Sequence, residues 1–164
     1  MDRIWAPWRS KYIKRKKPIP GCFLCKAYRS SARKDPKNLV LGRSSHNFII
    51  LNRYPYNNGH LMVVPIRHIA SFEKLGEKER LDFLKLLDQS LTILKKALRP
   101  QGFNVGINLG QAAGAGVPGH LHLHVVPRWI GDTNFMPVIA ETKVVSDSLE
   151  ATYRKLHRLL GQKK

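Results

Sequence analysis

The stretch HLHLHVV, residues 120–126, decides how this chain is interpreted. Three of the seven histidines occur here at every second position, with leucine between them. Side chains alternate between the two faces of a β-strand, whereas a helix would scatter them around its axis. The spacing therefore predicts a strand in which the three imidazoles line one face. Leu121, Leu123 and Val125 would then point into the core.

Imidazoles on one face favour two kinds of chemistry. Neutral imidazole is the commonest metal ligand in proteins, and histidine is also a covalent nucleophile. Three partly buried structural histidines are the alternative without function. The glycine-rich loop GQAAGAGVPG (110–119) directly precedes the motif, and glycines let backbone N–H groups approach an anion closely. The loop could be a plain surface connection, but beside the histidines it favours phosphate chemistry.

Apolar and β-branched runs predict four further strands. They cover residues 39–42, 47–52, 60–65 and 102–110. The polar run KAYRSSARKDPKN, residues 26–38, predicts a loop.

Two segments have helical periodicity. Leucines recur at three- and four-residue steps and predict a helix over about 77–98, ended by Pro100. Its expected apolar face is formed by Leu84, Leu87, Leu91, Leu94 and Leu98. Residues 146–160 predict a closing helix.

The order of elements indicates the fold class. Strand, strand, strand, helix, strand, strand is not the alternation that builds a parallel sheet, and it predicts an antiparallel sheet with helices on one side, the α+β class. The predicted organisation is an N-terminal arm over 1–20, a central domain over 21–145 and a C-terminal helical segment over 146–164.

Length and composition narrow the class of protein. A chain of 164 residues suits one domain with a sizeable core. No apolar run is long enough for a transmembrane helix, so we expect no membrane partner. The first residues carry basic side chains but no apolar stretch behind them, which disfavours a secretory signal and favours the cytoplasm.

The charge balance points to anionic partners. The net charge is +18, from 29 Lys and Arg against 11 Asp and Glu, and such an excess attracts nucleotides, polyphosphates or nucleic acid by long-range steering. A solvated basic surface is the alternative. The arm over 1–20 combines basic residues with Trp5, Trp8 and Tyr12. These aromatic side chains could stack on bases, or could pin the arm to the domain or to a second subunit.

Taken together, these motifs resemble the histidine triad family. HLHLHVV matches its His-φ-His-φ-His-φ-φ motif, where φ is apolar. The resemblance continues through LNRYPYNNGHLMVVPIRHI (51–69), NLGQAAGAG (108–116) and PRWIGDTNF (127–135), and includes IWAPWR (4–9) and CFLC (22–25). The chain is most similar to diadenosine tetraphosphate phosphorylases and to fragile-histidine-triad-like dinucleoside polyphosphate hydrolases. The resemblance implies a five-stranded antiparallel sheet with a long helix, usually dimerised.

The resemblance also implies a mechanism. His122, the middle histidine, would attack the α-phosphate of an adenine nucleotide and form a nucleotidyl-histidine, which water or inorganic phosphate would then release. His124 would hydrogen-bond the phosphate. Splitting one displacement between like-charged partners into two is the physical advantage of the covalent step.

Nucleotide-binding positions carry over from the family one at a time. Asn52 would bind the ribose hydroxyls, or simply start a turn. Ile50 would line the adenine pocket, or sit in the core. Asn108 would contact the phosphate side of the site, or end a strand. Gly116 belongs to the loop that would approach the phosphates.

The loop departs from many relatives in one respect. Where they carry Gln followed by Ser or Thr, this chain has Gly116 and Val117. It lacks the amide and hydroxyl that would assist the leaving group in the hydrolases. It therefore resembles the phosphorylase-like branch, in which inorganic phosphate is the acceptor.

The two cysteines predict a structural zinc site. Cys22 and Cys25 have the CxxC spacing of a zinc knuckle. The resemblance, which extends here to galactose-1-phosphate uridylyltransferases, adds His68 and His120 as the other two ligands. A redox pair and two ordinary buried cysteines are the alternatives. His46, His60 and His157 are expected to be structural or surface residues.

The lead hypothesis is thus an enzyme that cleaves dinucleoside polyphosphates through His122, acting as a homodimer. Within that class, the substrates could instead be adenosine phosphoramidates or other AMP conjugates. A nucleotide-binding module with little turnover is a hypothesis from another class. A nucleic-acid-binding protein that uses its basic arm is a third.

Overall fold

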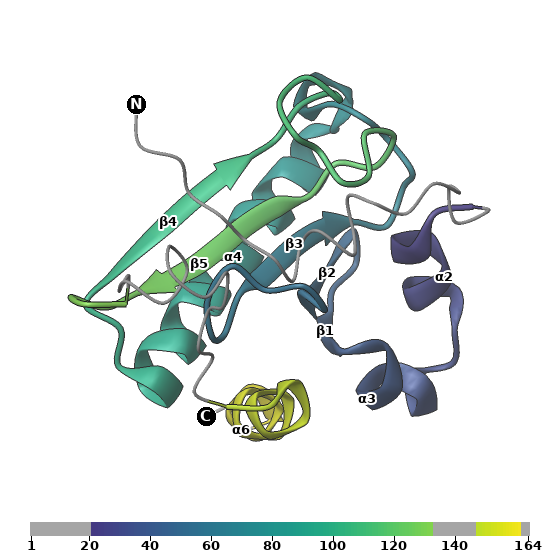
Figure 1. Ribbon diagram of the computed structural model, residues 1–164. Coiled ribbons are helices and arrows are strands. Elements are labelled where there is room, and N and C mark those ends of the chain that lie inside the picture. Colours follow the sequence, from purple (N-terminus) through teal and green to yellow (C-terminus); the bar gives the residue numbers. More distant parts are fainter. Residues whose placement is uncertain (1–20, 133–146, 162–164) are drawn as a thin grey trace.

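The computed structural model describes residues 21–132 and 147–161 (Figure 1). Five strands form one sheet in the order β1-β2-β3-β5-β4, and every neighbouring pair is antiparallel. The strands are β1 (Val40–Arg43), β2 (Asn47–Leu51), β3 (Leu61–Pro65), β4 (Gly102–Ile107) and β5 (Leu123–Arg128). The predicted α+β class is confirmed. The predicted basic arm over 1–20 lies outside the described residues.

The long helix α4 (Glu77–Leu98) has the predicted bounds and packs against β2, β3 and β5. It lies along one face of the sheet in Figure 1. Its buried side includes Phe83, Leu86 and Leu94. Leu84, which was predicted to face the core, is 52% exposed. That prediction was wrong because the neighbouring Phe83 takes the core position, which turns Leu84 toward solvent.

The closing helix of the described chain is α6 (Leu149–Gly161). It packs on α4 and on the edge strand β1. Tyr153 is buried at this contact, and its hydroxyl donates a hydrogen bond to the Val40 carbonyl, 2.9 Å away. The helix thereby covers one edge of the sheet, whereas β4 forms the opposite edge.

The polar run 26–38 is not the loop that was predicted. It lies within α2 (Phe23–Arg29), η1 (Ala32–Lys34) and α3 (Asp35–Asn38). Leu24 and Ala27, three residues apart on α2, are buried in the core and hold that helix against the sheet. The Arg43 guanidinium binds the Asp35 carboxylate and the Tyr28 carbonyl, and so ties these short helices to β1.

The histidine motif is a strand only in its second half, because β5 begins at Leu123. Before that point the backbone bonds elsewhere: the His120 N–H donates to Val117 and the Leu121 N–H to Ile69. The predicted alternation of side chains still holds for the apolar residues. Leu121, Leu123 and Val125 are all buried.

The register places one row of residues across the middle of the sheet. Ile50 pairs with Met62, Met62 with His124, and His124 with Gly106. Directly paired residues project from the same face of an antiparallel sheet. The face that carries His124 therefore also carries Ile50.

Among the described helices, none combines the length and apolar character needed to cross a bilayer.

Candidate active site and metal centre

The three motif histidines divide between two neighbouring clusters. The His120 ring lies 4.8 Å from that of His68, centroid to centroid, beside the two cysteines. The His122 and His124 rings lie 4.9 Å apart, edge to face. The single histidine face predicted from the alternation is thus split into a Cys–His cluster and a His–His cluster.

The Cys–His cluster gathers the four residues that the sequence predicted. The ligand atoms of Cys22, Cys25, His68 and His120 all lie within 4.8 Å of one another. Individual separations are 3.2 Å from Cys22 Sγ to His120 Nδ1, 3.3 Å from Cys25 Sγ to His68 Nδ1, and 3.2 Å between the two Nδ1 atoms. Tetrahedral zinc with sulfur and nitrogen ligands places neighbouring ligand atoms about 3.5 Å apart. The cluster therefore has the size and donor set of a zinc site.

A hydrogen bond fixes His120 in the tautomer that can bind a metal through Nδ1. Its Nε2 lies 2.8 Å from the Pro65 carbonyl oxygen, which can only accept, so the ring proton resides on Nε2. Nδ1 then presents its lone pair to the cysteines. Burial lowers the pKa of His120, which keeps the imidazole neutral. A second ring nitrogen bound to a carbonyl is the usual way in which proteins orient a metal-ligating histidine.

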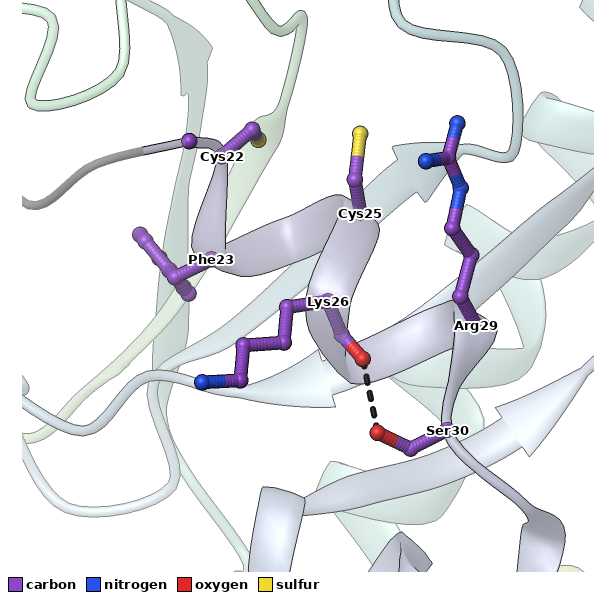
Figure 2. Close-up of a pocket in the computed structure, with 7 residues that line it drawn as sticks. Cys22, Phe23, Cys25, Lys26, Arg29 and Ser30 are labelled. Atoms are coloured by element: carbon purple, nitrogen blue, oxygen red, sulfur yellow. Dashed lines mark hydrogen bonds between the residues drawn. The ribbon is translucent and has the colours of Figure 1, made fainter.

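The two thiols come from the start of α2, as Figure 2 shows. Burial and the neighbouring Cys22 raise the pKa of Cys25. Arg29, one turn further along, extends from the same side of the helix and opposes that shift. Deprotonation of the Cys25 thiol would therefore be favoured by a nearby positive charge such as a bound dication.

His122 is held in one tautomer by the backbone. Its Nδ1 lies 2.8 Å from the His120 carbonyl oxygen, so Nδ1 carries the proton and donates it. Nε2 is left with the lone pair. The side chain is only 5% exposed, and burial lowers the pKa of His122. At neutral pH the ring is therefore a neutral imidazole with a defined nucleophilic atom.

A hydrogen-bond relay from Tyr56 through His60 fixes which ring nitrogen of His124 carries the proton. The Tyr56 N–H donates to Nδ1 of His60 over 3.0 Å, and the ring of Tyr56 stacks on that of His60. A neutral His60 then carries its proton on Nε2, which lies 2.9 Å from Nδ1 of His124. His124 accepts at Nδ1 and carries its own proton on Nε2. It therefore has an N–H that can donate to an anion.

His60 was not predicted to belong to the site, and it is fully buried. A lone histidine at the start of a strand gives no periodic signal. Only the pairing of β3 with β5, which sets Met62 opposite His124, brings it there. The sequence signal available was the turn NNG before it, since a polar residue between a turn and a buried strand needs a partner.

The predicted nucleotide-binding residues occupy different surroundings. Ile50 is 2% exposed and belongs to the core, on the sheet face of His124. The Asn52 carboxamide lies 3.3 Å from His60 Nδ1 and accepts from the Tyr54 N–H, so it also forms the predicted turn. Asn108 is half-buried just beyond β4, and Gly116 is exposed in the glycine-rich loop.

Known proteins are similar to this chain over most of its length. The HIT domain model matches residues 33–129. The chain is 37% identical to the AP-4-A phosphorylase of Mycobacterium tuberculosis over 161 residues, which cover 95% of this chain and 83% of that protein.

Two solved structures are similar in fold. A zinc-bound histidine triad family protein from Mycobacterium smegmatis has a TM-score of 0.66 and 23% identity, covering 87% of this chain and 94% of that one. The Plasmodium falciparum diadenosine triphosphate hydrolase, solved with cyclomarin A, has a TM-score of 0.63 and 18% identity, covering 96% of each chain.

Proposed function

Because the chain belongs to the HIT domain family, we propose that it is an enzyme that cleaves dinucleoside polyphosphates at the α-phosphate. In this proposal His122 is the nucleophile and inorganic phosphate is the acceptor. The observation that carries the proposal is the hydrogen bond from His122 Nδ1 to the His120 carbonyl. It leaves one buried imidazole nitrogen with its lone pair directed away from the backbone. The similarity to an AP-4-A phosphorylase supports the substrate class.

The first step forms one bond and breaks one bond. His122 Nε2 attacks the α-phosphorus, forming an N–P bond, while the bond from that phosphorus to the bridging oxygen breaks. With diadenosine tetraphosphate, ATP leaves and AMP stays on the histidine. An oxygen of inorganic phosphate then displaces the histidine and yields ADP. The carbonyl of His120 stabilises the positive ring during the covalent stage, because it accepts from Nδ1 throughout.

Charge on the phosphate oxygens needs donors around them. We assign His124 to this role, since the relay through His60 places its proton on Nε2. Backbone N–H groups of the loop 110–119 are the other donors. Gly110 and Gly114 have positive φ angles there, and the space beside both Cα atoms is open. Phosphate can thus approach the backbone closely.

The nucleoside half would bind beside the two rings. Ile50 shares the sheet face of His124 and offers an apolar surface to the adenine. Asn52, next to His60, would bind the ribose hydroxyls. Asn108, at the end of β4, would contact the phosphates together with Gly116. These assignments rest on the family motif and on the sheet register.

Zinc would be held by Cys22, Cys25, His68 and His120. Its chemistry there is structural: four protein ligands fill a tetrahedral shell and leave no position for substrate. In this proposal the cluster holds two backbone segments in place. The cluster fastens α2 to the segment that precedes β5, and so fixes the His120 carbonyl on which His122 depends.

We also propose that the enzyme is a homodimer joined at β4. The other edge strand, β1, is covered by α6, but β4 is an edge whose middle residues, 104–106, are exposed. Val105 is 43% exposed and the nearby Leu109 is 50% exposed. A long edge strand with apolar side chains readily pairs with a second copy.

Product analysis tests the proposal. The protein is incubated with diadenosine tetraphosphate, with and without inorganic phosphate, and the nucleotides are separated by ion exchange. ADP and ATP formed only with phosphate support the phosphorylase. AMP and ATP formed without phosphate would make it a hydrolase.

The matched variants are His122→Ala, which removes the nucleophile, and His157→Ala, which removes an exposed histidine on α6. His122→Ala should lose all turnover and His157→Ala none. Full activity of His122→Ala would overturn the mechanism. Turnover only of an adenosine phosphoramidate would overturn the substrate class.

A further inference from the structure

Beyond the reaction site, we propose that a basic face on α6 and the end of α4 binds single-stranded nucleic acid. We define the α4–α6 basic face as the exposed side chains of Lys96, Arg99, Arg154, Lys155 and Arg158. Lys96 lies in the last turn of α4, and Arg99 is the residue after that helix. The other three lie on α6, where residues three and four apart are neighbours on the helix surface.

Two hollows flank α6 and are both lined by this face. One, of about 540 Å³, is lined by Lys96, Arg99 and Lys155, together with Trp129. The other, of about 620 Å³, is lined by Arg154 and Arg158 together with His157, Tyr153 and Pro36. The cations thus surround concave surface. A strand of phosphates can follow such a surface, as in the electrostatic grooves of single-strand-binding proteins.

The positive charge of this face is not neutralised within the described parts of the chain. The ion pairs found there join Arg43 to Asp35, Arg67 to Glu79 and Arg128 to Asp132. None includes a residue of the basic face.

Two acidic residues also line these hollows. Asp147 already accepts a hydrogen bond from Asn58, and Glu150 lies at the start of α6. Five cations against two carboxylates leave a net positive face.

Arg99 occupies a conformation that usually belongs to glycine. Its φ is +48° in the left-handed region, where it ends α4 and its N–H donates to Lys95. A side chain in that region costs about 1 kcal/mol relative to glycine. The chain bears that cost while placing a guanidinium in the hollow. Guanidinium groups bind phosphate oxygens in a two-pronged geometry that suits a phosphodiester.

Trp129 determines which polyanion fits best. It is half-buried and lines the same hollow as Lys96, Arg99 and Lys155. An indole beside three cations can stack on an unpaired base while the cations bind the neighbouring phosphates. A duplex hides its bases from such stacking. The face therefore favours single strands of RNA or DNA, both of which carry the phosphodiester and a base.

Fluorescence anisotropy with labelled U20 RNA and dT20 DNA, titrated over a range of salt concentrations, tests the inference. The test variant is Lys96→Gln/Arg99→Gln/Lys155→Gln. The control, Lys74→Gln/Lys78→Gln/Lys85→Gln, removes the same charge from exposed residues at and near the other end of α4. Loss of three phosphate contacts should reduce the slope of log K against log salt by about 2. The control slope should stay at the wild-type value.

Two further variants and a labelled duplex DNA of the same length separate the possible sources of binding. Trp129→Leu should weaken binding about fivefold or more through lost stacking. His122→Ala should bind the oligonucleotides like the wild type, because this inference does not depend on the proposed reaction. Equal weakening in the control triple, no effect of Trp129→Leu, or preference for duplex DNA would each overturn the inference. The relative affinity for U20 and dT20 identifies the natural class of strand.

Discussion

Nε2 of His60 lies 2.9 Å from Nδ1 of His124, and this contact connects the residue just before β3 to the motif strand β5. Because the Tyr56 N–H fixes the tautomer of His60, His60 fixes that of His124. We predict that His60→Leu lowers kcat for diadenosine tetraphosphate on the order of 10²-fold, since it releases the orientation of a phosphate donor. KM should change much less. Steady-state kinetics measures both.

His60→Gln provides the control for that prediction. The glutamine amide is a donor that can reach Nδ1 of His124, so it should restore part of kcat, whereas an effect of lost packing alone would be the same in both variants. Circular dichroism melts of both proteins would identify any loss of folding. Unchanged kcat in His60→Leu would show that the relay has no role.

Metal content tests the Cys–His cluster. We expect one zinc per chain by inductively coupled plasma mass spectrometry, and its loss in Cys22→Ser/Cys25→Ser. A metal present at about a thousand times its dissociation constant stabilises the fold by roughly 4 kcal/mol. Chelation should therefore lower Tm by about 10 °C. His68→Ala should show the same loss, and His157→Ala should keep its zinc. Metal retained after removal of both thiols would contradict the site.

The fold was predictable where periodicity is long. Helix α4 runs for 22 residues, and its repeated leucines and the following Pro100 defined both ends. Periodicity failed for α2, because seven residues hold only two buried positions, Leu24 and Ala27, in a polar surrounding. It also misassigned Leu84, since the choice between Leu84 and Phe83 as the core residue depends on how the helix is rotated on the sheet.

The site was predictable where the ligands carry their own pattern. The CFLC spacing identified Cys22 and Cys25, the family resemblance implied His68 and His120, and the structure brings these four residues together. The separation of His120 from His122 followed from the family resemblance and not from the alternation of the motif, which places both side chains on one face. It arises because the His120 and Leu121 amides bond outside the sheet, which delays the start of β5 to Leu123.

The hydroxyl of Tyr153 anchors α6 to the edge strand β1. It donates to the Val40 carbonyl over 2.9 Å inside the core. Tyr153→Phe removes the donor and leaves a buried acceptor, which should lower the free energy of unfolding by about 1–2 kcal/mol. Urea denaturation measures the change. His157→Ala is the control on the same helix, because it removes a ring that stacks on Tyr153 but leaves the hydrogen bond.

The same residue predicts a dependence on alkaline pH. Burial raises the pKa of Tyr153 to about 12 in the folded protein, from an ordinary value near 10. A raised folded pKa means that the folded state binds more protons between those values. The free energy of unfolding should therefore fall as pH rises from 10 to 12, by at most about 1.4 kcal/mol per pH unit from this group. Tyr153→Phe should have a shallower slope, and equal slopes would exclude the effect.

The exposed edge β4 predicts the oligomeric state. Val105 lies in the middle of β4 and has an exposed apolar side chain. It pairs with the buried Val125 on the neighbouring strand β5. A glutamate there would set two like charges near each other across a self-paired edge, which is destabilising. We expect the wild type to be a dimer by light scattering after gel filtration and Val105→Glu to be a monomer at the same concentration. Thr92→Glu, an equal charge change on an exposed residue of α4, should remain a dimer. A dimeric Val105→Glu would place the interface on another surface, and a monomeric wild type would show that the chain acts alone.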